Sequence, residues 1–242
     1  MKKVLVTGAT RGIGKAIALD LAEKGYEVHG IFNQSKSETE KLKNSGIIFH
    51  QADLSLRADT LRIAKELVGL NFFAIVNNAG IWEADSIDDA DLDIWDRTIE
   101  VNLTAPFILS SVLGKTLSKG GSIVNIASTD GMMGAYDGIS YSASKSALIN
   151  LTKSLGNYFG PKGVRVNAIA PGWIDTSMVG EAPALASKEM TPLRRNGKPE
   201  EIASVVEFLI SNTASYINGE TIVVDGGLVN TDYSLKVESE NE

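Results

Sequence analysis

The sequence predicts one α/β domain: a doubly wound, Rossmann-type parallel sheet of seven strands flanked by helices. Two observations predict it. Short β-rich runs alternate with longer helical patterns up to residue 225, and several of the short runs are almost continuously apolar. Parallel strands covered by helices on both faces have this character, as in Val4-Leu5-Val6 and Ile123-Val124. No linker or repeat divides the sequence, so we expect residues 1–230 to form a single dinucleotide-binding and catalytic domain.

Each expected strand is bounded by turn residues and followed by a helical pattern. The expected strands are Lys3–Thr7, Glu27–Phe32, Ile47–Gln51, Phe73–Asn77, Ser122–Ala127, Val164–Ala170 and Thr221–Val224. Among the helices, Gly12–Lys24 ends before Gly25, a residue suited to the position after a helix. Glu200–Ser211 follows Pro199, which suits a first turn.

Composition excludes several classes of protein. The chain of 242 residues has no cysteine, which excludes disulfides and Cys-based zinc sites, and its net charge of −7 gives no basic surface for nucleic acid. No apolar run approaches the ~18 residues of a membrane span, and the N-terminus is typical of a first strand, not of a signal peptide. His29 and His50 lack metal-ligand spacing. We therefore expect a cytoplasmic, soluble protein without a metal.

The C-terminal end differs from the rest of the chain. Residues 231–242 are polar and acidic and show no period. We interpret them as a frayed tail, with an interaction tail as the alternative.

A glycine loop follows the first strand and opens a helix. Gly8, Gly12 and Gly14 have the spacing G-x-x-x-G-x-G. Glycine permits a positive φ at the turn and lets the backbone approach a pyrophosphate at the helix N-terminus. The spacing differs from the usual G-x-G-x-x-G, so its place between a strand and a helix is what indicates a dinucleotide site.

Two further segments support a cofactor site. Asp53-Leu54 follows the third strand, where a carboxylate can accept from an adenine amino group; a turn or helix-cap role is the alternative. Asn77-Asn78-Ala79-Gly80 follows the fourth strand, where the amides can brace the sheet and the small pair leaves room for a ribose.

The end of the second strand indicates which cofactor is used. An NAD site usually has an acidic residue there for the ribose 2′-hydroxyl. This chain has Asn33 and Ser35, with Lys36 next and no acid before Glu38. Together with Arg11 in the glycine loop, these residues suit a 2′-phosphate. We expect NADP(H), with NAD(H) as the less favoured alternative.

The chemistry is expected at the end of the fifth strand. Ser128 ends that strand, Tyr141 follows 13 residues later, and Lys145 is four residues beyond Tyr141. An i, i+4 pair shares one helix face. A phenol with its ordinary pKa of ~10 is a poor catalyst at neutral pH, and a nearby ammonium together with the positive charge of an oxidised nicotinamide stabilises the phenolate and lowers that pKa. Ser128 can then orient a carbonyl oxygen for protonation by Tyr141.

These motifs together resemble the short-chain dehydrogenase/reductase family in its compact branch, from about Lys3 to Gly227, and within it the 3-oxoacyl-acyl-carrier-protein reductases of fatty acid metabolism. The resemblance implies a catalytic tetrad of Asn102, Ser128, Tyr141 and Lys145, in which Asn102 holds a helix kink and a proton-relaying water. It also implies that the backbone of Ile174 and the hydroxyl of Thr176 engage the nicotinamide carboxamide. The full predicted cofactor site is Gly8, Thr10, Arg11, Gly12, Ile13, Gly14, Asn33, Ser35, Asp53, Leu54, Asn78, Ala79, Gly80, Tyr141, Lys145, Pro171, Gly172, Ile174 and Thr176.

The resemblance further implies a homotetramer assembled through two long helices near Asp93–Lys119 and Tyr141–Gly160. A lid is expected over Ser177–Met190. The substrate is a carbonyl compound, an acyl thioester in the closest relatives. An acyl carrier protein is acidic, however, and the helix near the site offers only Lys115 and Lys119 to it.

Alternatives to a thioester therefore stay open: a sugar or small hydroxy compound as substrate, or a non-catalytic regulator that senses the cofactor. The substrate face is expected to include aromatic, acidic and sulfur-containing side chains: Trp82, Glu83, Tyr136, Asp137, Trp173 and Met178.

Overall fold

The computed structural model describes residues 1–85, 87–88, 91–177 and 189–232. Its centre is an all-parallel, seven-stranded sheet in the order β3-β2-β1-β4-β5-β6-β7, which confirms the predicted fold class. The strands are β1 (Lys3–Thr7), β2 (Glu27–Phe32), β3 (Ile48–Gln51), β4 (Ala74–Asn77), β5 (Ser122–Ile126), β6 (Arg165–Pro171) and β7 (Thr221–Val224). Each lies within one residue of its predicted bounds.

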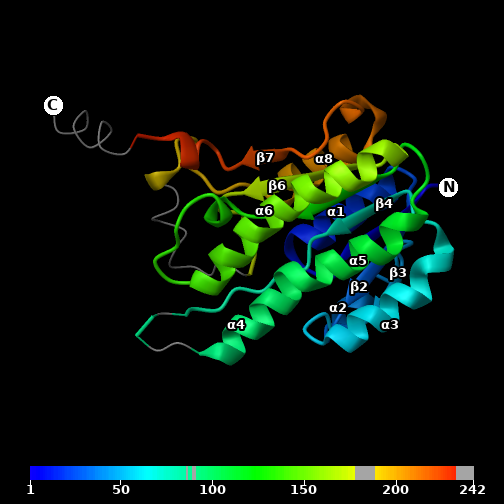
Figure 1. The fold of residues 1–242 in the computed structure, drawn as a ribbon, viewed down its shortest axis with the longest axis horizontal. Coiled ribbons are helices and arrows are strands. Elements are labelled where there is room, and N and C mark those ends of the chain that lie inside the picture. The colour runs from blue at the N-terminus through cyan, green and yellow to red at the C-terminus, as the bar shows by residue number, and fades with distance from the viewer. Residues whose placement is uncertain (86, 89–90, 178–188, 233–242) are drawn as a thin grey trace.

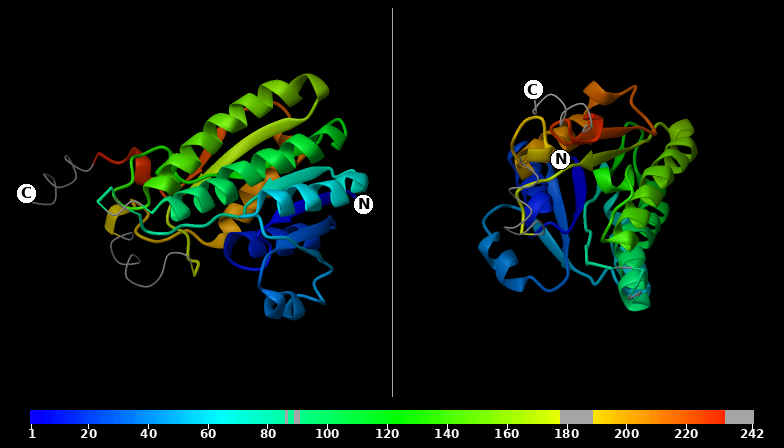
Figure 2. Two further views of the ribbon diagram at one scale, coloured as in Figure 1. Left: turned by 60° about the horizontal axis from the view of Figure 1, so that its bottom comes forward. Right: turned by 90° about the vertical axis from the view of Figure 1, so that its left-hand side faces the viewer.

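Helices cover both faces of the sheet (Figures 1 and 2). On one face α1 (Gly12–Glu23) packs against α8 (Pro199–Ile210). The other face carries α3 (Arg57–Leu67), α5 (Ala105–Leu113) and α6 (Ile139–Phe159), while the short α2 (Lys36–Lys41) follows β2. No helix in the described part of the chain is long and apolar enough to cross a membrane.

The apolar run in β1 is explained by these two layers. Val4 and Val6 join the hydrophobic cluster under α1 and α8, whereas Leu5 joins the cluster under α3 and α5. All three are fully buried. Successive strand residues point to opposite faces, so a strand covered on both sides must be apolar throughout.

The long helix expected near Asp93–Lys119 is present as one continuous helical run from Leu92 to Thr116, but it is not α-helical throughout. The structure has α4 (Leu92–Ile99), a π-helical segment at Glu100–Thr104, then α5 and a short 3-10 turn. Pro106 lies in the first turn of α5 and has no N–H to donate to the carbonyl of Asn102 four residues earlier. The helix therefore widens at Asn102, and such π segments often mark functional sites.

The strand order reverses between β1 and β4, since β2 and β3 lie on one side of β1 and β4 to β7 on the other. Open α/β sheets bind their ligands at the carboxyl ends of the strands near this reversal. The loops that follow β4, β5 and β6 gather on the side away from the N-terminus (Figure 1). Among the predicted site residues, Asn78 follows β4, Ser128 follows β5 and Gly172 follows β6, while the glycine loop follows β1.

Candidate active site

The glycine loop presents bare backbone at the start of α1. Gly8 and Gly12 have φ values of +68° and +51°, which favour glycine. A Cβ on Gly14 would lie 2.2 Å from the Gly8 carbonyl oxygen and 2.3 Å from Nδ2 of Asn78. The first turn of α1 has no acidic side chain. The loop therefore fits a pyrophosphate, which backbone N–H groups and the helix dipole would hold.

Thr7 fixes this loop to the end of β4, and the sequence analysis did not assign it a role. Its Oγ1 accepts from the backbone N–H groups of Asn78 and Ala79 at 2.9 and 2.8 Å. Asn78 Nδ2 donates in return to the Thr7 carbonyl at 2.9 Å. Asn78 is thus a brace between the two strands, and its only signal in the sequence was its place at a strand end.

Polar side chains with no side-chain hydrogen bond to the described residues lie near the ends of β1 and β2. Arg11 precedes α1 and is exposed, as is Asn33, while Ser35 precedes α2 without making a side-chain capping bond. The Glu38 carboxylate is already paired with Lys41, whose Nζ donates a hydrogen bond to Glu38 Oε1 at 2.6 Å. The charge and hydrogen-bond donors at this end of the site fit a ribose 2′-phosphate.

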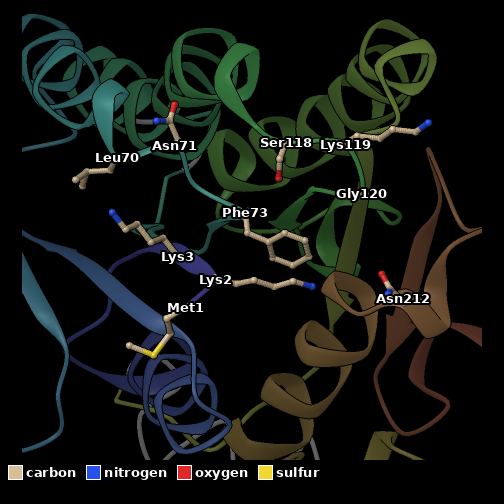
Figure 3. A pocket seen from close by; sticks show the side chains of 10 residues that line it. All are labelled: Met1, Lys2, Lys3, Leu70, Asn71, Phe73, Ser118, Lys119, Gly120 and Asn212. Carbon is tan, nitrogen blue, oxygen red and sulfur yellow. The ribbon is translucent and has the colours of Figure 1, made fainter.

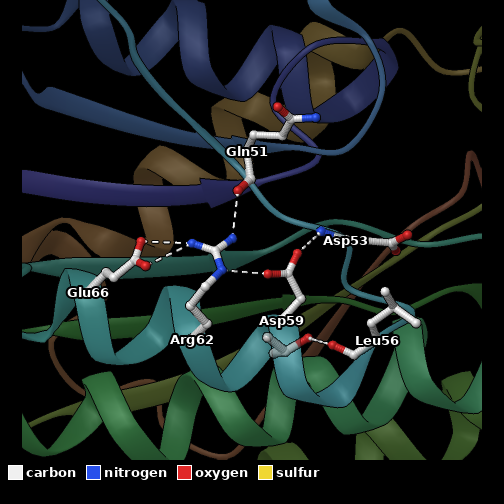
Figure 4. A network of polar contacts seen from close by, with 7 residues as sticks. Gln51, Asp53, Leu56, Asp59, Arg62 and Glu66 are labelled. Carbon is white, nitrogen blue, oxygen red and sulfur yellow. Dashed lines mark hydrogen bonds and ion pairs between the residues drawn. The ribbon is translucent and has the colours of Figure 1, made fainter.

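A polar network holds the connection from β3 to α3 (Figure 4). The Arg62 guanidinium donates to Asp59 at 2.6 Å, to Glu66 at 2.8 Å and to the Gln51 carbonyl at 3.0 Å. Asp59 in turn accepts from the backbone N–H of Asp53 at 2.7 Å. The network sets the backbone position of Asp53.

The side chains of Asp53 and Leu54 have structural roles. Asp53 Oδ1 accepts hydrogen bonds from the backbone N–H and the hydroxyl of Ser55, at 2.9 and 2.7 Å. These bonds correspond to the turn role that the sequence analysis gave as the alternative for Asp53. Leu54 is buried in the core. A contact between Asp53 and adenine stays a prediction.

The segment after β6 completes the rim of the cofactor site. A Cβ on Gly172 would lie 2.8 Å from Cβ of Asp225, so only glycine fits there. Ile174 is buried and pairs with Gly197 in an isolated bridge. Thr176 reaches the glycine loop, since its Cγ2 lies 3.3 Å from the position of a Cβ on Gly12.

Parts of three predictions fall on residues 178–188 and 233–242, outside the described chain. They concern most of the lid, Met178 of the substrate face, and most of the C-terminal tail.

Three of the predicted catalytic residues meet at the ends of β5 and α6. Ser128 directly follows Ala127 at the end of β5, and Tyr141 lies in the first turn of α6 in hydrogen-bond contact with it. Lys145 is buried; its Nζ donates to the Ile126 carbonyl at 2.8 Å and lies 5.5 Å from the centroid of the Tyr141 ring.

Burial sets the protonation of the Tyr141–Lys145 pair. It raises the pKa of Tyr141 to about 12; the Ser128 hydrogen bond opposes this shift and the Asp130 charge adds to it. Burial also lowers the pKa of Lys145 to about 8. For the protein alone, burial is the largest effect on the Tyr141 pKa. The expectation that Lys145 and an oxidised nicotinamide together lower this pKa toward the working range concerns the enzyme with its cofactor bound and stays a prediction. At pH 7 Tyr141 is a neutral proton donor.

Asn102 joins the π segment to the loop after β4. Its Oδ1 accepts from the Ile81 N–H at 2.9 Å, and its Nδ2 donates to the Ile81 carbonyl at 3.0 Å and to Ser144 Oγ at 3.1 Å. Lys145 Nζ and Asn102 Oδ1 each lie 3.4 Å from the position of a Cβ on Gly80. The four predicted catalytic residues are thus gathered in one place.

Comparison with known proteins agrees with this geometry. A family model described as enoyl-(acyl carrier protein) reductase matches residues 8–229. The 3-oxoacyl-[acyl-carrier-protein] reductases of Synechocystis sp. and Aquifex aeolicus are 38% and 39% identical, over 93% and 94% of this chain and 96% and 97% of their own. A short chain dehydrogenase from Burkholderia cenocepacia, solved in complex with NADP, is 33% identical and has a TM-score of 0.90 over 94% of this chain and 98% of its own.

The chain belongs to the short-chain dehydrogenase/reductase family. The predicted family and enzyme class are thereby confirmed, and the predicted cofactor agrees with the NADP of the Burkholderia neighbour.

One further residue shapes this short-chain dehydrogenase/reductase site and was missed in the sequence. The Asp85 carboxylate accepts from the backbone N–H groups of Ile139 and of Ser140, the latter at 2.8 Å, and so caps the start of α6. These hydrogen bonds hold the pKa of Asp85 below its usual range, against the opposing effect of burial. The cap is 54 residues away in the chain, too distant for a local sequence signal.

A hollow with a volume of about 450 Å³ lies elsewhere in the described chain (Figure 3). It is at the amino end of β1, opposite the family's active site, and Lys2, Lys3 and Lys119 line it together with Phe73. Lys2 Nζ lies 3.8 Å from the centroid of the Phe73 ring. None of the predicted site residues lines this hollow, so it has no part in the reaction.

Proposed function

We propose that this chain interconverts a carbonyl and a secondary alcohol with NADP(H), and that 3-oxoacyl thioesters are its first candidate substrates. The observation that carries the proposal is Tyr141, a neutral phenol in contact with Ser128 and beside Lys145, at the strand edge that also holds the glycine loop. The names of the reductases from Synechocystis and Aquifex support the thioester.

Reduction follows from the state of these side chains. NADPH, when bound, supplies the hydride. The Ser128 hydroxyl donates to the carbonyl oxygen and holds it against Tyr141, which gives its proton to that oxygen as the alcohol forms. The positive charge of Lys145 stabilises the phenolate that is left, and Asn102 keeps the loop around Ile81 in place. Oxidation uses the same atoms in reverse.

A small hydroxy ketone or a sugar is the second candidate substrate. It is supported by Asp137 of the expected substrate face and by Asp130, which the sequence analysis did not include in that face and whose negative charge lies beside Tyr141.

A substrate screen that follows NADPH absorbance tests the proposal. We expect turnover on at least one of an acetoacetyl-carrier-protein thioester, a pantetheine β-ketoester, sugars and small ketones, and a lower Kd for NADPH than for NADH. Tight NADPH binding without turnover on any of them would establish the regulator alternative. A tighter Kd for NADH would overturn the assigned cofactor preference.

We also propose a cytoplasmic homotetramer that assembles through α4–α5 and α6. Trp95, Phe107 and Tyr158 on these helices are 40%, 51% and 55% exposed, and contact with a second copy of the chain would bury their apolar surface. Sedimentation velocity should give about four times the 25.8 kDa chain mass. Phe107→Glu should lower that mass, whereas Leu61→Glu on α3 should not; a monomeric wild type contradicts the proposal.

A further inference from the structure

Asp130 is fixed beside the catalytic residues by its backbone. Its N–H donates to Ser128 Oγ at 3.1 Å, and its carbonyl accepts from Ser142 Oγ at 2.7 Å. The turn also packs tightly on α6, since a Cβ on Gly131 would lie 2.7 Å from the carbonyl carbon of Lys145. The backbone of Asp130 therefore has a fixed position relative to Ser128 and to α6, the helix that carries Tyr141 and Lys145.

The carboxylate of Asp130 is half-buried, and no donor in the described part of the chain bonds it. Burial and the nearby charge of Asp137 raise its pKa, and no cation acts against them. The Asp130 charge in turn raises the pKa of Tyr141, so the carboxylate and the phenol occupy one region. A half-buried carboxylate without a donor is costly, which points to a partner that arrives with the substrate.

The position of Asp130 relative to the reacting carbonyl group indicates what kind of partner this is. A carbonyl oxygen protonated by Tyr141 must lie next to Ser128 and Tyr141, so the carbons attached to it lie near the turn that follows Ser128. We propose that Asp130 selects carbonyl substrates with a hydrogen-bond donor, a hydroxyl or a protonated amine, on a carbon close to the carbonyl. This inference rests on the proposed carbonyl chemistry and decides among its substrates.

The same carboxylate disfavours a plain acyl chain, so among the proposed substrates this inference favours the hydroxy ketone or sugar over the 3-oxoacyl thioester. An alkyl group at this place leaves Asp130 desolvated and unpaired, and an anionic group is repelled by both Asp130 and Asp137. A hydroxyl or ammonium instead forms a charge-assisted hydrogen bond. A binding site that accepts a hydrogen bond from its substrate rejects analogues without that donor far more strongly than an apolar pocket rejects an extra methylene group.

Two pairs of ketones of nearly equal shape test the proposal. The amine pair is 1-(dimethylamino)-2-propanone and 4-methyl-2-pentanone; the hydroxyl pair is hydroxyacetone and 2-butanone. In each pair the kcat/KM ratio with NADPH is measured for the wild type and for Asp130→Asn. Intrinsic reactivity differs between ketones but is common to both proteins, so the change in ratio reports the side chain alone.

We expect the amine-pair ratio to fall about tenfold or more in Asp130→Asn, with a smaller fall for the hydroxyl pair. A fall in the amine pair alone identifies a cation as the partner, and a fall in the hydroxyl pair alone identifies a hydroxyl. Unchanged ratios in both pairs overturn the inference. Asp96→Asn, an exposed aspartate of α4, is the matched control and should leave both ratios as they are.

Binding separates this inference from the proposed function. Saturation-transfer NMR of the same ketones in the presence of NADP⁺ measures their preference without turnover. Equal preference in wild type and variant overturns the role of Asp130 whether or not the ketones react, whereas preferential binding with no turnover overturns only the proposed function. If Asp130→Asn fails to fold, as judged by thermal unfolding, Asp130→Ser replaces it, since serine can keep the turn.

Discussion

Tyr141→Phe should lower kcat by about 10²–10⁴ while the Kd for NADPH stays within about twofold of the wild-type value. The phenylalanine ring retains the packing of a half-buried side chain, and only the hydroxyl is lost. That hydroxyl is the neutral proton donor in contact with Ser128, whereas the Lys145 ammonium is directed to the Ile126 carbonyl. Steady-state kinetics and a fluorescence titration with NADPH measure the two quantities.

Tyr158→Phe provides the control for this experiment. Tyr158 lies near the end of the same helix and is 55% exposed, far from Ser128 in the sequence and on the opposite end of α6. The Tyr158→Phe variant should therefore keep the wild-type kcat. If Tyr141→Phe keeps more than a tenth of the wild-type kcat, Tyr141 is not the proton donor and the assignment of the site fails.

The strands of the sheet could be predicted from the sequence because each of them has its own local pattern of residues. Val4-Leu5-Val6 is apolar on every position, and only a strand covered on both faces requires that. The same holds for the site residues that follow strands directly, such as the glycine loop and Ser128, since the carboxyl ends of parallel strands meet at one edge. Local patterns thus place the parts of the site that the sheet itself positions.

Features that depend on contacts between distant segments could not be predicted in this way. Asp85 caps α6 from 54 residues away, and Asn102 holds Ile81 from 21 residues away. The protonation of the Tyr141–Lys145 pair is a property of burial, and the i, i+4 spacing contains no information about solvent. The spacing therefore predicted the right neighbours, whereas the raised pKa of Tyr141 in the protein alone follows from its burial.

Lys145→Met should abolish most turnover and yet raise the free energy of unfolding by about 2 kcal/mol at pH 7. The pKa of Lys145 is lowered from 10.5 to about 8 in the folded protein, so the buried ammonium destabilises the fold by roughly 3 kcal/mol. Methionine is of similar length and removes that cost. It also loses the hydrogen bond to the Ile126 carbonyl, which offsets about 1 kcal/mol of the gain.

The pH dependence distinguishes this cause from better packing. A lysine with a lowered folded-state pKa binds fewer protons in the folded than in the unfolded state, so the wild type recovers stability as the pH rises from about 8 to 10.5. The advantage of Lys145→Met should therefore be full below pH 8 and vanish near pH 10, and above about pH 10.5 the variant should be less stable by about 1 kcal/mol, because only the loss of the hydrogen bond to Ile126 remains. Denaturant unfolding of both proteins across this range measures it, with exposed Lys153→Met as the control. A gain that is constant with pH means that packing, and not the buried charge, separates the two proteins, and a loss of stability at pH 7 means that this ammonium is compensated within the fold.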